Sequence, residues 1–550
     1  MSAERDATEA MNGAGAADAE DAARWAFGED GPWYLERGRI AWLPGLEAVR
    51  QSAQAEVPDL TRARLVPPVG RFGEAFGRVG GALGRWWLAE RRGGGERSRA
   101  GLSRRLREAF EHLGPAYIKL GQIISSGRGL FPDELVAEFR KCRDQVPPEP
   151  FDHVRRVVEE DLGRSLEAVF SSFDRTCLAA ASIAQVHRAT LRNGEEVVVK
   201  VQRPGVAARV RADIAAMAWI APKLVGRIPV AALANPPALV ELFAETILEE
   251  LDFRLEAQNM LDVAYVLRHA GQTAVVVPRP HPELVTRRVL VMERLHGFAY
   301  DDVAGMRAAG IDTAEVLRSM MITFLEGAMI YGVFHGDLHG GNLFVMPDGR
   351  VALLDYGMTA RMDEKQRIAF LRMMMAGAAN DVRGQLAAFR DLGALDADAD
   401  LDELVTILKL DQPVRDPTRM SGEEIASEIS ELLKGLLKKG ARLPKPLMLY
   451  AKDMLFFDGA VAELAPDLNM FAEVARIYTY FATRHAHTIA AQIGVDPSRS
   501  ALDLTGVKAS LGLESDAESI THREIQDRRR IVQKKLEETG ARLPGIDAGE

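Results

Sequence analysis

The chain has 550 residues, of which 47% are hydrophobic and 27% charged, a composition that excludes a disordered or collagen-like protein. This length exceeds one ordinary core, so two or three domains, or one large domain with extensions, are expected. The formal net charge of −10 argues against a general nucleic-acid binder, and the two cysteines are too few for a disulfide framework and fit a reducing compartment.

Residues 1–22 are rich in Ala, Gly and acidic side chains. They hold too few large apolar groups to offset the entropy of ordering, so we predict a disordered acidic tail. A signal peptide begins with basic residues and a transit peptide contains few acidic ones, so this acidic segment fits neither. The longest charge-free stretch, residues 228–240, contains three prolines and is too short to span a bilayer. We therefore predict a cytoplasmic protein without a transmembrane helix.

Residues 23–105 are predicted to form an N-terminal extension that contains the one basic zone of the chain. Between Arg71 and Arg107 there are ten arginines against three glutamates. Within residues 70–92, apolar residues recur at helical spacing beside arginines at positions 71, 78, 85 and 92. Two interpretations stay open: this helix docks on the main domain, which we favour slightly, or it contacts an anionic membrane surface as a peripheral segment.

Residues 106–165 have a helical pattern with a break at Gly114-Pro115. Lys119 and Gln122 are three residues apart, so they share one face of the second helix. Lysine is scarce, since only 14 of the 69 basic residues are Lys. A lysine on an inward face needs a carboxylate partner, whereas a lysine at a helix edge extends its ammonium into solvent. We prefer the inward orientation.

Residues 166–296 are predicted as a smaller lobe of strand-like runs. Residues 186–201 form a hairpin signal, with Asn193-Gly194 between two apolar alternations. Lys200 lies in the second strand and is the only lysine within twenty residues. It is either a solvated charge at a strand end or a compact cation beside a phosphate, and the scarcity of lysine favours the phosphate.

Residues 297–382 are predicted as a catalytic core. His335-Gly336-Asp337 leads to Asn342, two short strands follow around a turn, and Asp355-Tyr356-Gly357 comes after the second strand. Antiparallel pairing brings Asn342 next to Asp355, an arrangement of oxygen donors that can hold Mg²⁺. Asp337 is then a candidate for orienting the nucleophile of a phosphoryl transfer. The alternative, three unrelated loop residues, leaves the kinase-like spacing as coincidence.

Residues 383–550 continue as predicted helices. The last of them spans residues 521–538, where Thr521 and Glu524 form a capping box.

Several segments together resemble the UbiB-like atypical kinases, relatives of the mitochondrial kinases associated with coenzyme Q biosynthesis. They are the two motifs above, Lys119-Leu120-Gly121-Gln122, the alanine-rich residues 179–184 before Gln185-Val186-His187, Glu250-Leu251-Asp252-Phe253 and Glu256-Ala257-Gln258-Asn259. The resemblance spans about residues 106–469. It implies an α+β, atypical protein-kinase-like bilobal fold with an N-terminal helical extension carrying the K-x-G-Q motif and a C-terminal helical extension.

The resemblance also implies roles for individual residues. Lys200 and Asp337 would be catalytic, with Lys200 holding the nucleotide phosphates and paired with Glu256, and Asn342 and Asp355 would bind Mg²⁺. The position of a glycine-rich phosphate loop would be taken by Ala179, Ala180, Ala181, Ser182, Ile183 and Ala184. Met292, Glu293 and Leu295 would form the adenine hinge. A regulatory set that occludes the cleft would comprise Lys119 and Gln122, with Glu250 or Asp252 as the acid.

The chain departs from the family pattern H-A-D-P-H-P-G-N in its catalytic loop. Leu338 and Gly340 replace the two prolines, so we expect a less rigid loop. The membrane-spanning helices of many family members are also missing from the sequence pattern, which argues against constitutive anchoring.

We predict an ATP- and Mg²⁺-dependent atypical kinase or ATPase that acts in isoprenoid-quinone (ubiquinone-like) or other lipid metabolism. Its expected partners are the nucleotide and a lipid or quinone precursor at an anionic membrane surface, with no nucleic acid. One alternative is a nucleotide-binding scaffold without useful turnover, and another is an active protein kinase. The sequence does not name the phosphoryl acceptor.

Overall fold

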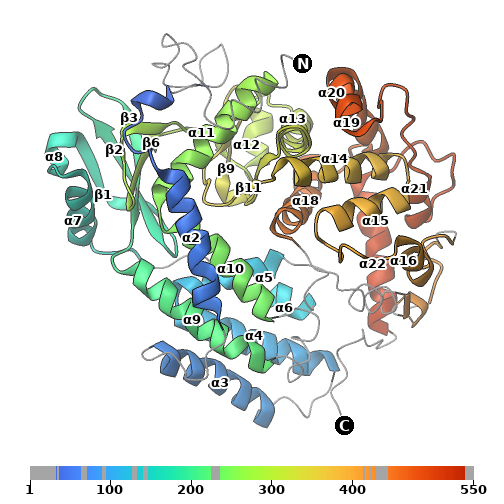
Figure 1. The fold of residues 1–550 in the computed structure, drawn as a ribbon, viewed down its shortest axis with the longest axis horizontal. Helices are drawn as coiled ribbons and strands as arrows, with labels where there is room; N and C mark the ends of the chain where they lie inside the picture. The colour runs from blue at the N-terminus through green and yellow to red at the C-terminus, as the bar shows by residue number, and fades with distance from the viewer. Residues whose placement is uncertain are drawn as a thin grey trace.

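The computed structural model shows a β-sheet lobe facing a larger helical lobe, which agrees with the predicted α+β class (Figure 1). The structure describes residues 33, 36–62, 71–89, 95–126, 133–139, 141, 147–224, 236–412, 415–421, 423–425, 427–428 and 444–538. The predicted tail, residues 1–22, lies outside the described residues.

A five-stranded antiparallel sheet, in the order β1-β2-β3-β6-β5, forms the smaller lobe. Its strands are β1 (Phe170–Ala180), β2 (Ala184–Leu191), β3 (Glu196–Gln202), β6 (Val289–Glu293) and β5 (Pro280–Val285). The hairpin predicted at Asn193-Gly194 is confirmed, since Thr190 pairs with Glu196 across it. Gly194 has a φ of +89°, which a residue with a side chain adopts only with strain.

The two faces of this sheet differ because successive side chains of a strand point to opposite sides. Along β3, Val197, Val199 and Val201 are buried in a core with α7 (Phe151–Leu162) and α8 (Leu166–Val169). Val198 and Lys200 lie on the opposite face, which α11 (Phe253–Ala270) also approaches through β5 and β6. One face of the sheet therefore builds a core and the other is left for the site.

A layer of helices lies below the sheet in Figure 1. It contains α2 (Leu46–Thr61), α3 (Arg71–Ala89), α4 (Gly95–Leu113), α5 (Pro115–Ser126), α6 (Asp133–Phe139), α9 (Val206–Leu224) and α10 (Pro236–Glu250), whereas the short η2 (Arg37–Arg39) precedes this layer and adds no residue to its core. These helices share a second core in which Ile214, Phe243 and Ile247 are fully buried. The predicted break at Gly114-Pro115 is confirmed, because α4 ends and α5 begins there.

The prediction of strand-like runs throughout residues 166–296 is wrong for α9, α10 and α11. Helices α9 and α10 bury apolar residues at helical spacing against the N-terminal helices, and α11 buries its apolar residues in the core shared with the larger lobe. The prediction failed because short apolar runs in a sequence do not distinguish a buried helix from a buried strand.

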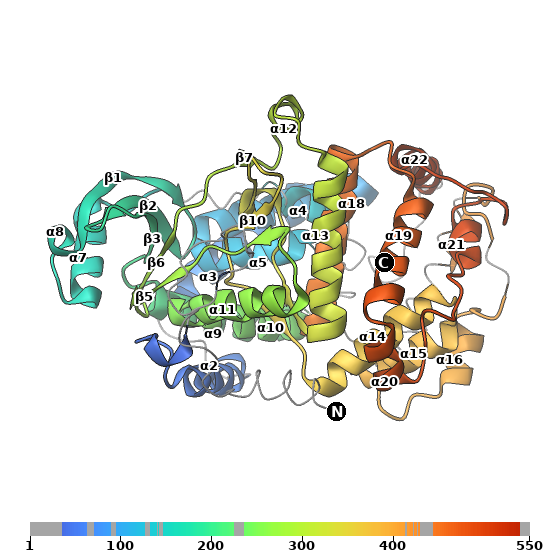
Figure 2. The ribbon, with the colours of Figure 1, turned by 90° about the horizontal axis from the view of Figure 1, so that it is seen from above.

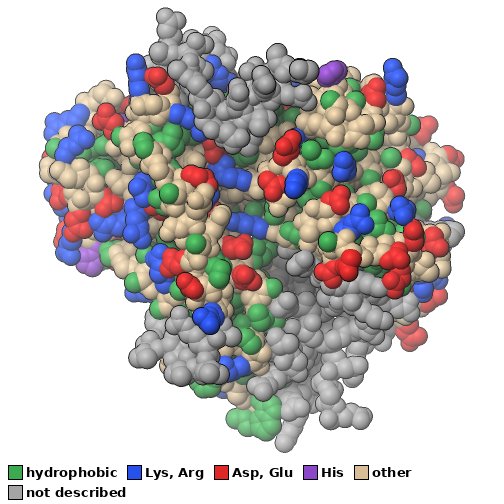
Figure 3. Space-filling model, viewed as in Figure 1, with side chains coloured by type: hydrophobic (Ala, Val, Ile, Leu, Met, Phe, Trp, Pro, Cys, Tyr) green, Lys and Arg blue, Asp and Glu red, His purple; other side chains and the backbone are tan. Residues whose placement is uncertain are grey.

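The basic amphipathic helix α3 docks on the protein. It packs on α4 and α9 and buries Ala75, Val79 and Ala82. Trp86 Nε1 donates a hydrogen bond to the carbonyl oxygen of Ser98 at 2.9 Å. The docked interpretation is therefore correct for the inner face of this helix. Its outer face carries the exposed hydrophobic side chains Phe76, Trp87 and Leu88. Figure 3 shows hydrophobic surface at the lower edge of the molecule, the region where Figure 1 places α3.

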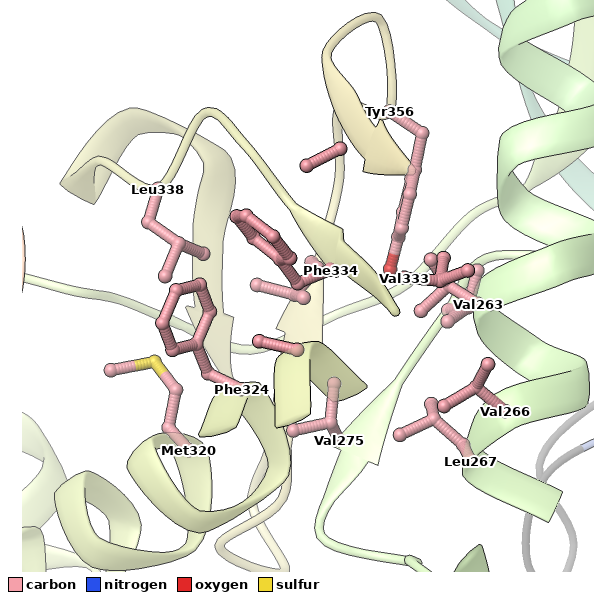
Figure 4. Close-up of a cluster of buried hydrophobic side chains, with 14 of the residues drawn as sticks. Val263, Val266, Leu267, Val275, Met320, Phe324, Val333, Phe334, Leu338 and Tyr356 are labelled. Atoms are coloured by element: carbon pink, nitrogen blue, oxygen red, sulfur yellow. The ribbon is translucent and has the colours of Figure 1, made fainter. Parts of the chain in front are cut away.

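The larger lobe combines helices with two small sheets. Its first elements are α12 (Val303–Ala308), α13 (Thr313–Glu326), a π-helical turn (Gly327–Tyr331), β4 (Val275–Val276), β7 (Phe298–Ala299), β8 (Val333–His335), β9 (Leu343–Val345), β10 (Val351–Leu353) and β11 (Thr359–Arg361). The sheets have the orders β4-β10-β9-β7 and β11-β8. Figure 4 shows Phe324 of α13 against Phe334 of β8, with Leu267 of α11 on the other side of the same core.

The chain ends in a group of helices opposite the sheet lobe (Figure 2). They are α14 (Glu364–Ala378), α15 (Val382–Asp391), α16 (Leu401–Ile407), α18 (Lys445–Leu464), α19 (Met470–Arg484), α20 (Ala486–Ile493), α21 (Thr505–Ser510) and α22 (His522–Glu538). The capping box is confirmed by the hydrogen bonds from Thr521 N to Glu524 Oε2 (2.7 Å) and from Glu524 N to Thr521 Oγ1 (3.3 Å). No helix in the described part of the chain is both long and apolar enough to cross a bilayer.

Candidate functional site

A cavity of about 980 Å³ lies between the sheet lobe and the predicted catalytic core. This volume is within the range of small-molecule sites. Its apolar lining comes from both lobes and includes Ala184, Val186, Val198, Met292, Leu295, Phe344 and Leu354. Its charged and amide lining includes Lys119, Gln122, Lys200, Asp337, Asn342, Asp355 and Lys452. The cavity thus offers apolar surface for a planar ring and charged groups for a polyanion.

Lys200 reaches the cavity because it shares the inner face of β3 with Val198. Its Nζ lies 2.7 Å from Glu256 Oε1 and 3.4 Å from Asp355 Oδ1. Glu256 is in the first turn of α11 and only 3% exposed. Burial raises the pKa of Glu256 to about 7 against the opposing effect of Lys200. Burial alone would lower the pKa of Lys200, but the carboxylates of Asp355 and Glu256 raise it above its ordinary value, so Lys200 stays charged.

Lys119 of α5 faces inward, as expected, and pairs with Glu250 at the end of α10. Its Nζ lies 3.0 Å from Glu250 Oε1, and both side chains are nearly buried. Gln122 and Ser125 follow at three-residue intervals and line the same cavity, so one face of α5 forms a wall of the site.

Asp252 is not the partner of Lys119, and that alternative is wrong. Its carboxylate caps α11 by accepting a hydrogen bond from Arg254 N at 3.1 Å, and it pairs with the Arg254 guanidinium at 2.6 Å. The reason is geometric, since α10 ends at Glu250 and Asp252 is already the N-cap of the next helix, α11. Asp252 therefore fixes the helix that carries Glu256.

The hairpin of β9 and β10 brings Asn342 and Asp355 together. Leu343 pairs with Leu353, and Leu354 N donates to the carbonyl oxygen of Asn342 at 3.0 Å. Asn342 Nδ2 donates to the Asp337 carbonyl oxygen at 3.3 Å, which leaves the amide oxygen as the donor atom for a cation. Burial by itself would raise the pKa of Asp355, but the charges of Lys200 and Lys119 outweigh this effect. The pKa is therefore below its ordinary value, and the carboxylate is ionised.

One amide and one carboxylate oxygen fit Mg²⁺, which usually takes one or two protein ligands and completes its shell with water and phosphate oxygens. Among the described residues, no cluster of three or more His, Cys, Asp or Glu side chains forms a closed metal site. Asn342 and Asp355 are thus two residues that could hold an ion of this kind. When bound, Mg²⁺ would supply positive charge against the phosphate oxygens.

His335 holds the catalytic loop against the Asp355 segment. Its Nδ1 accepts a hydrogen bond from Asp337 N at 3.1 Å, so its Nε2 carries the proton and donates to the carbonyl oxygen of Asp355. Burial lowers the pKa of His335 to about 4, which keeps the ring neutral and this bridge intact at neutral pH.

Lys452 of α18 is a site residue that the sequence reasoning missed. Its Nζ forms an ion pair with Asp337 Oδ1 and lies 3.5 Å from the carbonyl oxygen of Gly336. Burial by itself would raise the pKa of Asp337, but the charges of Lys452 and Lys119 outweigh this effect and bring the pKa well below its usual range. The scarcity of lysine, which marked Lys119 and Lys200, does not single out Lys452, because five of the 14 lysines lie within residues 434–452.

The alanine-rich loop reaches the cavity only in part. Ala179, Ala181 and Ala184 line it, whereas Ala180, Ser182 and Ile183 do not. Ser182 and Ile183 are buried, and Ile183 belongs to the core of the helical layer. The loop is tied down because Ala181 N donates to the Ala184 carbonyl oxygen at 2.8 Å. The expectation that all six residues face a nucleotide is therefore corrected.

The expected hinge comprises the last two residues of β6 and the segment that follows it. Met292, Glu293 and Leu295 all line the cavity. Burial raises the pKa of Glu293 to about 7, and Arg279 opposes this effect. The backbone here is fixed by a hydrogen bond from Glu293 N to the Arg279 carbonyl oxygen at 2.9 Å.

The catalytic loop is constrained despite the absence of the two prolines. Leu338 N donates to Asp453 Oδ1 of α18 at 3.0 Å, a bond that proline cannot make. Gly336 allows α18 to come close, since a Cβ at this position would lie 2.8 Å from Leu449 Cδ1. Contacts from the C-terminal region therefore supply the restraint that we expected to be lost.

The chain is similar in sequence to a family model and to known proteins. Residues 141–388 match the model of the ABC1 atypical kinase-like domain. An uncharacterized protein of Mycobacterium tuberculosis is 37% identical over 388 residues, which cover 68% of this chain and 77% of that protein. The Arabidopsis thaliana chloroplast protein ACTIVITY OF BC1 COMPLEX KINASE 1 is 33% identical over 384 residues (70% and 55%), and the probable protein kinase UbiB of Aeromonas hydrophila is 32% identical over 398 residues (70% and 70%). This chain therefore belongs to the UbiB-like family of atypical kinase-like proteins that carry the ABC1 domain.

Proposed function

We propose that this protein binds MgATP in the cavity and acts as an atypical kinase or ATPase of the UbiB type, in isoprenoid-quinone or other lipid metabolism. The observation that carries the proposal is the position of Lys200, whose Nζ lies 2.7 Å from Glu256 Oε1 and 3.4 Å from Asp355 Oδ1. A cation held in this way can bind nucleotide phosphates beside a metal-binding carboxylate.

Each charged group has a distinct part in this proposal. Lys200 holds the phosphates, and Asn342 and Asp355 hold Mg²⁺. Asp337, which is ionised and lines the cavity, orients the attacking water or acceptor hydroxyl. The apolar lining from β2, β3 and β6 receives the base, next to the hinge backbone after Met292.

The face of α5 that carries Lys119, Gln122 and Ser125 argues against a general protein kinase. It forms a wall of the cavity beside Asp337, where an extended protein substrate would have to enter. The remaining space suits a nucleotide and a small acceptor, such as a lipid-like or phenolic molecule.

One observation favours the alternative of a nucleotide-binding scaffold. The Asp337 carboxylate is already paired with Lys452, so it is not available as a free base. Turnover by the purified protein separates the two proposals.

We expect slow ATP hydrolysis by the purified protein, faster with anionic vesicles or phenolic quinone precursors, because these would complete the acceptor side of the cavity. Radiolabel transfer to generic protein substrates should be negligible beside ordinary kinase rates of about 1–100 per second. MgATP binding without any hydrolysis would support the scaffold. Steady phosphorylation of protein substrates would show that the cleft is open to them.

We also propose reversible contact of α3 with an anionic membrane surface, supported by its exposed Phe76, Trp87 and Leu88 and by Arg78 and Arg85. Each basic residue near such a surface contributes about 1 kcal/mol, and salt screens this attraction. Co-sedimentation with phosphatidylserine vesicles should therefore decrease as salt increases. Replacing the three apolar residues with serine should reduce binding, and unchanged binding by that variant would contradict the proposal.

A further inference from the structure

We propose that Lys452, on the C-terminal helix α18, is a catalytic residue whose ammonium binds the terminal phosphoryl group of the nucleotide beside Asp337. The inference rests on the proposed function and adds to it a residue outside the region that matches the ABC1 domain, residues 141–388. In this arrangement the C-terminal helices complete the site.

The first argument is that the three cavity lysines are paired differently. Lys119 pairs with Glu250, which does not line the cavity. Lys200 lies between Glu256, which does not line the cavity, and the proposed metal ligand Asp355, which does. Lys452 instead pairs with Asp337, the cavity-lining acid proposed to orient the nucleophile. The ammonium of Lys452 is therefore placed where the nucleophile and the transferred group meet, and not at the wall behind it.

The second argument is that the catalytic loop supplies no permanent cation of its own. None of the four residues between Asp337 and Asn342 is Lys or Arg. His339 lies in this stretch, but its Nδ1 accepts a hydrogen bond from Gly341 N at 3.1 Å and shapes the loop. Charge that develops on a transferring phosphoryl group needs a positioned donor. Lys452 is the cation in contact with Asp337.

The third argument is that α18 holds Lys452 in a fixed position. The adjacent Asp453 accepts the hydrogen bond from Leu338 N at 3.0 Å, and Phe457 on the same helix is fully buried. The side chains of Lys452 and Asp337 are only 17% and 14% exposed. A charge in such a site acts more strongly than one in water. An ammonium also has three N–H donors, so it can contact Asp337, the Gly336 carbonyl oxygen and a phosphate oxygen together.

The step that Lys452 would assist is balanced without any change to the lysine itself. In hydrolysis, the bond between the terminal phosphorus and the oxygen of the ADP leaving group breaks, and the bond to the water oxygen forms. The attacking water, oriented by Asp337, releases its proton to solvent. Lys452 remains protonated and only compensates the charge on the equatorial phosphoryl oxygens.

The test compares Lys452→Met, Lys452→Arg and the control Lys445→Met, which lies seven residues earlier on the same helix. Turnover of MgATP and separate affinities for MgATP and MgADP are measured on the full chain. Lys452→Met should lower kcat by about 100-fold, the loss typical of one transition-state donor. It should also reduce the preference for MgATP over MgADP while MgADP affinity stays within about twofold of the wild type. Lys452→Arg should retain the preference, and Lys445→Met should behave as the wild type.

A Lys452→Met protein that hydrolyses ATP at the wild-type rate or faster would overturn the inference, because Lys452 would then merely block Asp337. Equal losses of MgATP and MgADP affinity would also overturn it and indicate a structural role. If Lys452→Met does not fold, the double variant Lys452→Met/Asp337→Asn leaves no unpaired buried charge, and its MgATP preference must be lost. A wild-type protein that binds no nucleotide would refute the proposed function as well, which distinguishes that failure from the others.

Discussion

Asp355→Asn is expected to abolish the thermal stabilisation of this protein by MgATP. Asp355 is the carboxylate that lies beside Asn342 at the end of the β9–β10 hairpin and 3.4 Å from the Lys200 ammonium. The substitution keeps the shape of the side chain but removes the charge that Mg²⁺ requires. We expect the affinity for MgATP to fall by about 100-fold, which corresponds to ~2.7 kcal/mol of binding free energy.

The matched measurements separate the metal from the phosphate contribution. Lys200→Met should weaken the stabilisation by MgATP and also by ATP in the presence of EDTA, because the proposed function assigns Lys200 to the phosphates and not to the metal. Asp301→Asn, at an exposed aspartate of the same lobe, should leave the thermal shift unchanged. Equal stabilisation of the wild type and both site variants by MgATP would disprove the assignment of this cavity to a nucleotide.

Glu250→Gln is expected to lower the free energy of unfolding by about 3 kcal/mol, the lower end of the cost of breaking a buried ion pair. The Lys119 and Glu250 side chains are 13% and 12% exposed, and their charged atoms lie 3.0 Å apart. The variant leaves a buried ammonium without its nearest carboxylate. Asp337 and Asp355 also attract Lys119, which is why we expect the lower end of the range.

Urea unfolding of a double-mutant cycle measures this pair directly. The double variant Lys119→Met/Glu250→Gln removes both charges, so it should be more stable than Glu250→Gln alone. Glu241→Gln, at an exposed position on the same helix, serves as the control and should change the unfolding free energy by less than about 0.5 kcal/mol. A Glu250→Gln protein as stable as this control would show that the pair does not hold α5 against α10.

The resemblance to the UbiB-like family and the local patterns were sufficient to place most of the site. Asn342 and Asp355 meet because two three-residue strands and a short turn separate them, and antiparallel pairing leaves one arrangement for their ends. Lys200 faces the cavity because side chains alternate along a strand whose other face is apolar. Such relations depend on the backbone geometry of neighbouring residues, which a single sequence carries.

Other relations depended on packing between distant segments, and only the tertiary structure decided them. Lys452 pairs with Asp337 across 115 positions, because α18 packs against the catalytic loop at Gly336. The choice of Glu250 over Asp252 as the partner of Lys119 depended on where α10 ends. Ile183 points away from the cavity because it packs in the core of the helical layer. The sequence by itself determined the fold class, through the family resemblance, and the proximity of Asn342 and Asp355, which follows from local backbone geometry. The position of Lys452, the third cavity lysine, was determined by helix packing, because no local sequence pattern shows which distant side chain a helix brings to a loop.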